Sequence, residues 1–359
     1  AFAADKRCKL IAVTDEAGID KRRQELNERL AQALGVPYIA DLDKALTLAD
    51  VSVVSICAPP ERRGRIIVRC AEAGKQLYLD KSLAPQLAEV DAIVAAVHKA
   101  GVKSHMFTLN TQPWAQQMRT VLQQGRIGKL QAIHVDLFFA KARNGTAKLG
   151  LPRREEFPPQ RHQLLDAKRE LDNVGVYPLA LVRWLTGQHF KTVFGVTANY
   201  FFAEHQKRNV EDFGLLACTL EDGTPVTISA GRYGWTTHPA SGTNRTILAG
   251  SERTLVVDAH RPRLEVYTDE KPWTPPNVNP ADPIGFWSST MDEVHLRPKK
   301  TWVPIDPPGP SDAAYFLNCL DEKRDSDMNA REAAVVAEVL LAGYKSAATG
   351  EVVSLPLPR

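Results

Sequence analysis

The chain has no long hydrophobic run, no cysteine pair and no excess of charge of either sign. Its apolar runs are far shorter than the roughly 18 residues that span a bilayer, so the sequence predicts no transmembrane helix. With 45 basic and 42 acidic side chains the net charge is +3, and the basic residues form no stripe, which argues against nucleic-acid binding. Five cysteines are scattered without a CxxC pair, and nine histidines show no metal-ligand spacing. We therefore expect reduced thiols, a cytoplasmic protein and no metal site.

A length of 359 residues is more than one compact core usually holds, so we expect two domains, residues 1–108 and 109–359. In the first, short apolar segments rich in β-branched residues alternate with amphipathic segments. The expected strands are 9–15, 51–57, 76–80 and 102–107, and the expected helices are 21–34, 61–73 and 86–99. This alternation predicts a Rossmann-type parallel sheet, and hence an α/β protein.

After residue 109 the pattern changes to strands that follow one another without helices between them. The expected strands are 130–140, 192–202, 212–220, 225–234, 245–259 and 263–268, with a hairpin turn at 221–224. Proline-rich surface segments at 271–283 and 298–310 and a last helix at 328–348 follow. The second part is therefore expected to be an α+β domain with a large, mostly antiparallel open sheet.

Asp15 stands at the end of the first expected strand. In a dinucleotide-binding fold, an acidic residue there binds the adenosine ribose, about 20 residues after a glycine-rich phosphate loop. No G-x-G-x-x-G precedes Asp15, so we expect an N-terminally truncated fold, whose first strand and loop are either lost from this chain or absent from the protein. An exported form therefore stays open. A carboxylate repels a 2′-phosphate, which favours NAD over NADP, although Lys21 and Arg22 weaken that preference. The alternative is an ordinary turn aspartate.

Two further strands end in residues suited to a ligand site. Ligands of open α/β sheets bind at the carboxyl ends of the strands, so Ala58, Pro59, Pro60 and Asp80 are expected beside the cofactor. The alternative for the prolines is a simple turn into the next helix. Lys81 lies at the same edge, where an ammonium can bond a substrate hydroxyl and lower the pKa of a nearby phenol. A solvated surface lysine is the alternative.

The stretch LDNVGVYPLALVRWLTG (171–187) is interpreted as a loop that runs into an amphipathic helix, with Pro178 in its first turn. Beside the Lys81 ammonium, the phenol of Tyr177 is expected to relay a proton. Gly175 leaves room for close approach, and Asn173 offers both a donor and an acceptor. The alternative is an amphipathic tyrosine that caps a core helix.

Substrate contacts are expected from aromatic and polar side chains after two strands. Trp235 and His238 would form a stacking surface beside a hydrogen-bonding group, as a polyol requires. Asn110 and Trp114 are comparable candidates. A hairpin rich in aromatic residues, with a surface histidine, is the alternative for the first pair.

Residues 51–84 and 171–187 together resemble the Gfo/Idh/MocA oxidoreductase family. The first stretch ends in Asp80-Lys81-Ser82 where the family has Glu-Lys-Pro, and the second matches its Asp-x-Gly-x-His/Tyr motif. The resemblance implies a nicotinamide-binding Rossmann domain, then an open sheet whose free face makes a homodimer or homotetramer. It also implies that Lys81 is the catalytic lysine and Tyr177 the acid/base residue.

The chain departs from the family pattern in five respects, of which the missing phosphate loop is the largest. Ala180 stands three residues after Tyr177, where the family often has aspartate. Asn173 replaces the aspartate before the glycine and cannot carry a charge. Ser82 replaces a proline, and DAKREL (166–171) replaces a run of glycines.

We therefore expect an NAD- or NADP-dependent oxidoreductase that transfers hydride between nicotinamide and a secondary alcohol or ketone. Its substrate is expected to be a small sugar, cyclitol or glycoside, with Lys81, Tyr177 and Asn173 as the catalytic group. Two alternatives stay open: an NAD-dependent glycosidase on the same scaffold, and a non-catalytic sugar- or nucleotide-binding protein.

Overall fold

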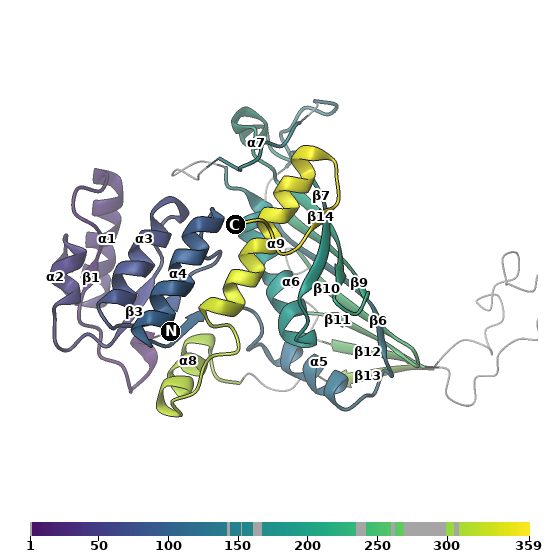
Figure 1. Ribbon diagram of the computed structural model, residues 1–359, viewed down its shortest axis with the longest axis horizontal. Helices are drawn as coiled ribbons and strands as arrows, with labels where there is room; N and C mark the ends of the chain where they lie inside the picture. The colour runs from purple at the N-terminus through teal and green to yellow at the C-terminus, as the bar shows by residue number, and fades with distance from the viewer. Residues whose placement is uncertain are drawn as a thin grey trace, which may run out of the picture.

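Two sheet-containing parts make up the protein, joined by helices that contact both (Figure 1). The computed structural model describes residues 2–141, 144–151, 153–160, 167–234, 242–259, 263–268, 299–304 and 309–359.

The N-terminal part contains the expected parallel strands, but they form two separate sheets. β1 (Val13–Thr14) pairs with β2 (Tyr38–Ile39), while β3 (Val53–Ile56), β4 (Gln76–Leu79) and β5 (Ser104–Met106) form a three-stranded sheet in that order. A cavity of about 1290 Å³ lies between β1 and β3, and both strands line it. Neighbouring strands in one sheet lie about 4.8 Å apart, which leaves no room for a cavity between them. β1 and β3 therefore belong to different sheets.

The helices of this part confirm the sequence prediction within one residue at most ends. They are α1 (Lys21–Leu34), α3 (Pro60–Glu72) and α4 (Leu87–Ala100), while the short η1 (Phe2–Ala4) and α2 (Leu42–Leu46) were not expected. Gly35 and Gly101 follow α1 and α4 with φ of 68° and 65°, the left-handed conformation that ends helices. A glycine directly after an amphipathic segment is therefore a local signal of the helix end.

The second part is a nine-stranded sheet in the order β13-β12-β11-β10-β6-β9-β8-β7-β14. It contains β6 (Leu130–Ala140), β7 (Phe190–Ala198), β8 (Phe213–Leu220), β9 (Pro225–Tyr233), β10 (Gly242–Gly250), β11 (Thr254–Asp258), β12 (Arg263–Thr268), β13 (Lys299–Pro304) and β14 (Val353–Ser354). All neighbours are antiparallel except β6 and β9, which confirms the mostly antiparallel open sheet. Several details differ from the prediction. Residues 245–259 form a hairpin of two strands, and the proline-rich segment 298–310 contains β13. The helices at 113–123, 203–208 and 312–321 were not expected, and the second of them lies between β7 and β8.

In the described residues after 108, the helices are α5 (Pro113–Gln123), α6 (Glu170–Thr186), α7 (Ala203–Arg208), α8 (Asp312–Asp321) and α9 (Ala330–Thr349). α8 packs against Tyr78 and His105 of the N-terminal part. α6 and α9 pack on one face of the sheet and on each other (Figure 1). The approach of α9 to β7 is close, since a Cβ added to Gly195 would lie 2.3 Å from the carbonyl oxygen of Gly343. α9 also contacts α4 and β5, so it joins the two parts.

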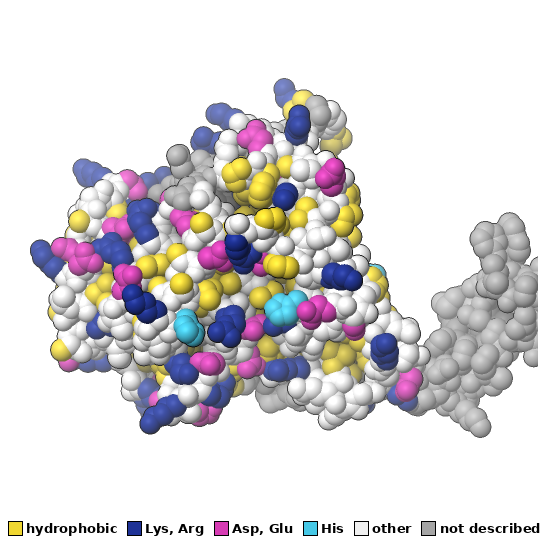
Figure 2. Space-filling model, in the orientation of Figure 1, with side chains coloured by type: hydrophobic (Ala, Val, Ile, Leu, Met, Phe, Trp, Pro, Cys, Tyr) yellow, Lys and Arg dark blue, Asp and Glu magenta, His cyan; other side chains and the backbone are white. Residues whose placement is uncertain are grey.

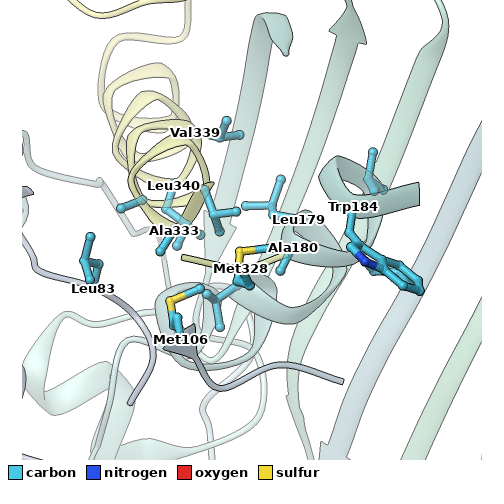
Figure 3. Close-up of a cluster of buried hydrophobic side chains, with 14 of the residues drawn as sticks. Leu83, Met106, Leu179, Ala180, Trp184, Met328, Ala333, Val339 and Leu340 are labelled. Carbon is cyan, nitrogen blue, oxygen red and sulfur yellow. The ribbon is translucent and has the colours of Figure 1, made fainter. Parts of the chain in front are cut away.

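A shared hydrophobic core fixes α6 against the strand ends of the N-terminal part. Figure 3 shows Leu83 and Met106 from that part beside Leu179 of α6 and Leu340 of α9. The backbone N–H of Met106 also donates to the carbonyl of Met328 at 2.8 Å. Burial of this apolar surface holds the residues that follow β4 close to α6.

Candidate active site

α6 begins earlier than the sequence predicted. It starts at Glu170, so Asn173 and Tyr177 lie inside the helix, and Pro178 is an internal residue rather than part of the first turn. Their i, i+4 spacing places Asn173 and Tyr177 on one face of the helix. Gly175 permits the close packing: a Cβ there would lie 2.8 Å from the side chain of Leu171.

Lys81 reaches that face from the end of β4. Its Nζ donates to the Asn173 carbonyl oxygen at 2.6 Å and to Asn173 Oδ1 at 2.5 Å. Nζ also lies 5.2 Å from the centroid of the Tyr177 ring, within the range of a cation–π contact. The structure therefore brings together the ammonium and the phenol that the sequence predicted to meet.

The acid–base properties of this pair differ in part from the expectation. Burial lowers the pKa of Lys81, an effect that the nearby carboxylates of Asp80 and Asp172 oppose. Burial raises the pKa of Tyr177 to about 12, and the charge of Asp80 adds to the rise. We expected the ammonium to lower the pKa of Tyr177; instead the Lys81 Nζ lies over the ring face and donates its bonds to Asn173. In this arrangement Tyr177 holds its proton at neutral pH.

The strand ends beside Lys81 are held by Arg63, a residue that sequence reasoning missed. Arg63 Nε donates to the carbonyl of Ala58 at 3.0 Å, Nη2 pairs with Asp80 Oδ2 at 3.1 Å, and Nη1 donates to the carbonyl of Ser82. Its side chain is only 4% exposed. Pro59 and Pro60, the N-cap and first residue of α3, lie beside Ala58 at the same edge. Arginine in the RRGR stretch of an amphipathic helix normally signals a solvated face, so no local pattern could have identified Arg63.

Asp15 ends β1 at the predicted edge, but its carboxylate is already paired. Arg62 donates to its two oxygens at 2.6 and 3.2 Å, Asn27 donates at 3.0 Å, and Arg23 Nε lies 3.8 Å away. Burial raises the pKa of Asp15, but the hydrogen bonds to its carboxylate outweigh this effect and bring the pKa below its usual value. The bond from Arg62 lowers the pKa most. The arginines compensate the charge that was expected to repel a 2′-phosphate.

The amide of Asn173 is held on its other side by Glu170, which the sequence did not identify. Nδ2 donates to Glu170 Oε2 at 2.8 Å, and Arg232 Nε donates to the same oxygen at 3.2 Å. Glu170 is 3% exposed. Because it precedes the matched motif and charged residues are mostly exposed, nothing in the sequence marked Glu170 as part of the site.

The expected substrate contacts have mixed outcomes. Trp114 is 7% exposed and packs in the hydrophobic core, so it is a core residue rather than part of a substrate wall. Asn110 is 4% exposed; its Nδ2 lies 3.4 Å from the carbonyl of Ala180, and its buried Oδ1 has no partner within the described residues. Trp235 and His238 lie outside the described residues.

Lys and Arg side chains are interspersed with Asp and Glu on the face seen in Figure 2. In the part of the chain that the structure describes, no helix has both the length and the hydropathy needed to cross a membrane.

Comparison with known proteins places both parts of the chain in one family. Residues 3–108 match the model of an oxidoreductase family with an NAD-binding Rossmann fold, and residues 115–256 match the GFO/IDH/MocA C-terminal domain. A Bacillus subtilis protein named uncharacterized oxidoreductase YrbE is 21% identical over 65% of this chain and 63% of its own length. The 4-carboxy-2-hydroxymuconate-6-semialdehyde dehydrogenase of a Sphingobium strain is 26% identical over 38% of this chain and 43% of its own length. The chain thus aligns with less than two thirds of either relative.

The solved structures agree on the fold. A levoglucosan dehydrogenase in complex with NADH superposes with a TM-score of 0.72 at 18% identity, covering 96% of this chain and 90% of that protein.

Proposed function

Because the chain belongs to the Gfo/Idh/MocA family of oxidoreductases, whose N-terminal domain is an NAD-binding Rossmann fold, we propose that it acts on a secondary alcohol or ketone of a sugar, cyclitol or glycoside. The observation that carries the proposal is the Lys81 ammonium, which is held by Asn173 and lies over the ring of Tyr177. A levoglucosan dehydrogenase among the similar folds supports a small carbohydrate as substrate.

The residues at the strand ends fit the nicotinamide dinucleotide that the family implies. Asp15 supplies a carboxylate for a ribose. Ala58, Pro59 and Pro60 follow β3 at the same sheet edge as Asp80, which precedes Lys81. The bound nicotinamide would accept or supply the hydride. NAD is slightly favoured over NADP because Asp15 carries a negative charge, a preference that the arginine contacts weaken.

The side chains of the site divide the remaining work. Tyr177 gives a proton to the substrate oxygen when a ketone is reduced; in the reverse direction only its phenolate form accepts the proton of the alcohol. Lys81 polarises that oxygen and stabilises negative charge on it. Asn173 holds Lys81 rather than the substrate, since both of its oxygens accept from Nζ. Asn110, with its unpaired buried Oδ1, remains the proposed polar contact for substrate.

The test is substitution of the two proton-handling groups. Lys81→Ala and Tyr177→Phe should each lower kcat by about 10²-fold, the scale of general acid–base catalysis, and leave dinucleotide affinity nearly unchanged. Reduced-nicotinamide absorbance with a panel of polyols measures turnover, and calorimetry measures NAD and NADP binding. Tyr200→Phe, at a tyrosine that is 57% exposed, is the matched control. Near-normal turnover in either variant would remove that residue from the mechanism.

The same measurements separate the two alternatives. A glycosidase would release product without net formation of NADH, because its oxidation is transient. A binding protein would show affinity for dinucleotide or sugar without turnover of any substrate.

We further propose domains 1–108 and 109–359 and a homodimer or homotetramer through the sheet face opposite α6 and α9. That face carries apolar side chains, among them Val196, which is 40% exposed, and Ala217. Light scattering coupled to size-exclusion chromatography, with Val196→Lys as the disrupting variant, tests the assembly.

A further inference from the structure

The Asn173 side chain lies between two charged groups, the Lys81 ammonium and the Glu170 carboxylate. The Asn173 amide accepts from Lys81 Nζ at Oδ1 and donates from Nδ2 to Glu170 Oε2, at 2.5 and 2.8 Å. A carboxylate only accepts hydrogen bonds and an ammonium only donates them. If the amide were reversed, its NH₂ would face the ammonium and its oxygen would face the carboxylate. Glu170 and Lys81 therefore select one orientation of the amide between them.

Glu170 carries its charge although it is buried. It lies in the first turn of α6, where the helix dipole favours a negative charge. Arg232 Nε donates to Oε2 at 3.2 Å, and His205 Nε2 lies 3.8 Å from Oε1. Burial raises the pKa of Glu170, but the neighbouring His205, Arg232 and Asn173 outweigh that effect, so the pKa lies below its usual value.

We propose that Glu170 is a positioning residue, which acts through Asn173 to hold the Lys81 ammonium against Tyr177. The Asn173 side chain is neutral, so it places no negative charge next to Lys81. The carboxylate of Glu170 lies on the far side of the Asn173 amide and supplies a negative charge there. The positioning of Lys81 by Glu170 through Asn173 is argued from the contacts alone. Its consequence for turnover rests on the proposed function.

Other charges also act on Lys81 and must stay fixed in any test. Asp80 and Asp172 favour the ammonium, while Arg63 and Lys168 oppose it. Because Glu170 is in contact with none of these four in the described structure, a change at Glu170 is a change in one charge near Lys81.

The test is the pKa of Lys81, followed in ¹H–¹³C spectra of the full-length protein labelled at lysine Cε, with the signal assigned by Lys81→Arg. Glu170→Gln should lower this pKa by about 1, since one negative charge at this range is removed from a partly screened site. The double variant Glu170→Gln/Asn173→Asp should restore it to the wild-type value or above. Glu155→Gln removes an equally buried carboxylate that has no contact with Asn173, and it should leave the pKa unchanged.

An unchanged pKa in Glu170→Gln, or an equal fall in Glu155→Gln, would overturn the proposal. If the Gln variants do not fold, Glu170→Asp keeps the charge but shortens the reach to Asn173. A lowered Lys81 pKa in Glu170→Asp supports the proposal, and an unchanged one overturns it.

Turnover provides a separate measurement. Glu170→Gln should lower kcat with little change in KM, and the added Asn173→Asp should recover it. A pKa shift in a protein that turns over no polyol would overturn the proposed function and leave the positioning role intact.

Discussion

Replacement of Arg63 tests whether one buried guanidinium holds together the strand ends on which Lys81 depends. Arg63→Met keeps the apolar stem but removes the donors to the carbonyls of Ala58 and Ser82 and to the carboxylate of Asp80. A buried acceptor left without its donor costs about 1–3 kcal/mol, so the two carbonyls together account for about 2–6 kcal/mol. The Asp80 pair adds little, because that carboxylate side chain is 34% exposed and is screened by solvent.

We therefore expect Arg63→Met to lower the free energy of unfolding by about 3 kcal/mol. Urea denaturation measures this as a lower midpoint at an unchanged m value. Arg65→Met is the matched control: Arg65 lies on the same helix, its side chain is 55% exposed, and its pair with Glu16 should be worth less than about 1 kcal/mol. Equal losses in the two variants would refute the reasoning, because they would show that the three contacts of Arg63 contribute no more than a surface ion pair.

Two further outcomes follow from other ion pairs. Arg62→Ala frees the carboxylate of Asp15 and removes a cation from the ribose site, so the ratio of the dissociation constants for NADP and NAD should rise about tenfold in calorimetry; an unchanged or lower ratio would contradict this assignment. Burial raises the pKa of Glu155, but two arginine neighbours bring it below the usual 4.5. Its contribution to stability is therefore full above about pH 4.5 and is lost as the pH falls through the lower value of the folded protein. Glu155→Gln should flatten the acid side of the stability curve, and an unchanged slope would show that Glu155 has no part in it.

The parts of the fold that follow from local pattern were predicted well. Helix α1 and strand β6 have the predicted bounds, because amphipathic periodicity and a left-handed glycine such as Gly35 are local signals. The predicted start of α6 was wrong because Asn173, Gly175 and Pro178 are all typical of loops and helix starts. Packing against the sheet extends the helix through them.

The same division applies to the site. Lys81 and Tyr177 could be predicted to meet because one ends a parallel strand and the other belongs to a helix that the family motif places over it. Arg63 and Glu170 could not, because each is a charged residue that only tertiary contacts bury. The direction of the Tyr177 pKa was also beyond the sequence, since it depends on burial and on where the ammonium lies over the ring.

The geometry gives the two proton-handling groups different tasks. A phenol with a pKa near 12 keeps its proton at neutral pH, so Tyr177 is better suited to donate to the oxygen of a ketone that is being reduced than to deprotonate an alcohol. Lys81 is shifted the opposite way by burial, and its charge is needed most when the substrate oxygen is negative. The carboxylates of Asp80 and Asp172 oppose that shift and favour the ammonium beside the phenol. A protonated phenol cannot accept a second proton, so oxidation of an alcohol in this site requires Tyr177 as the phenolate, and its raised pKa favours the direction of reduction.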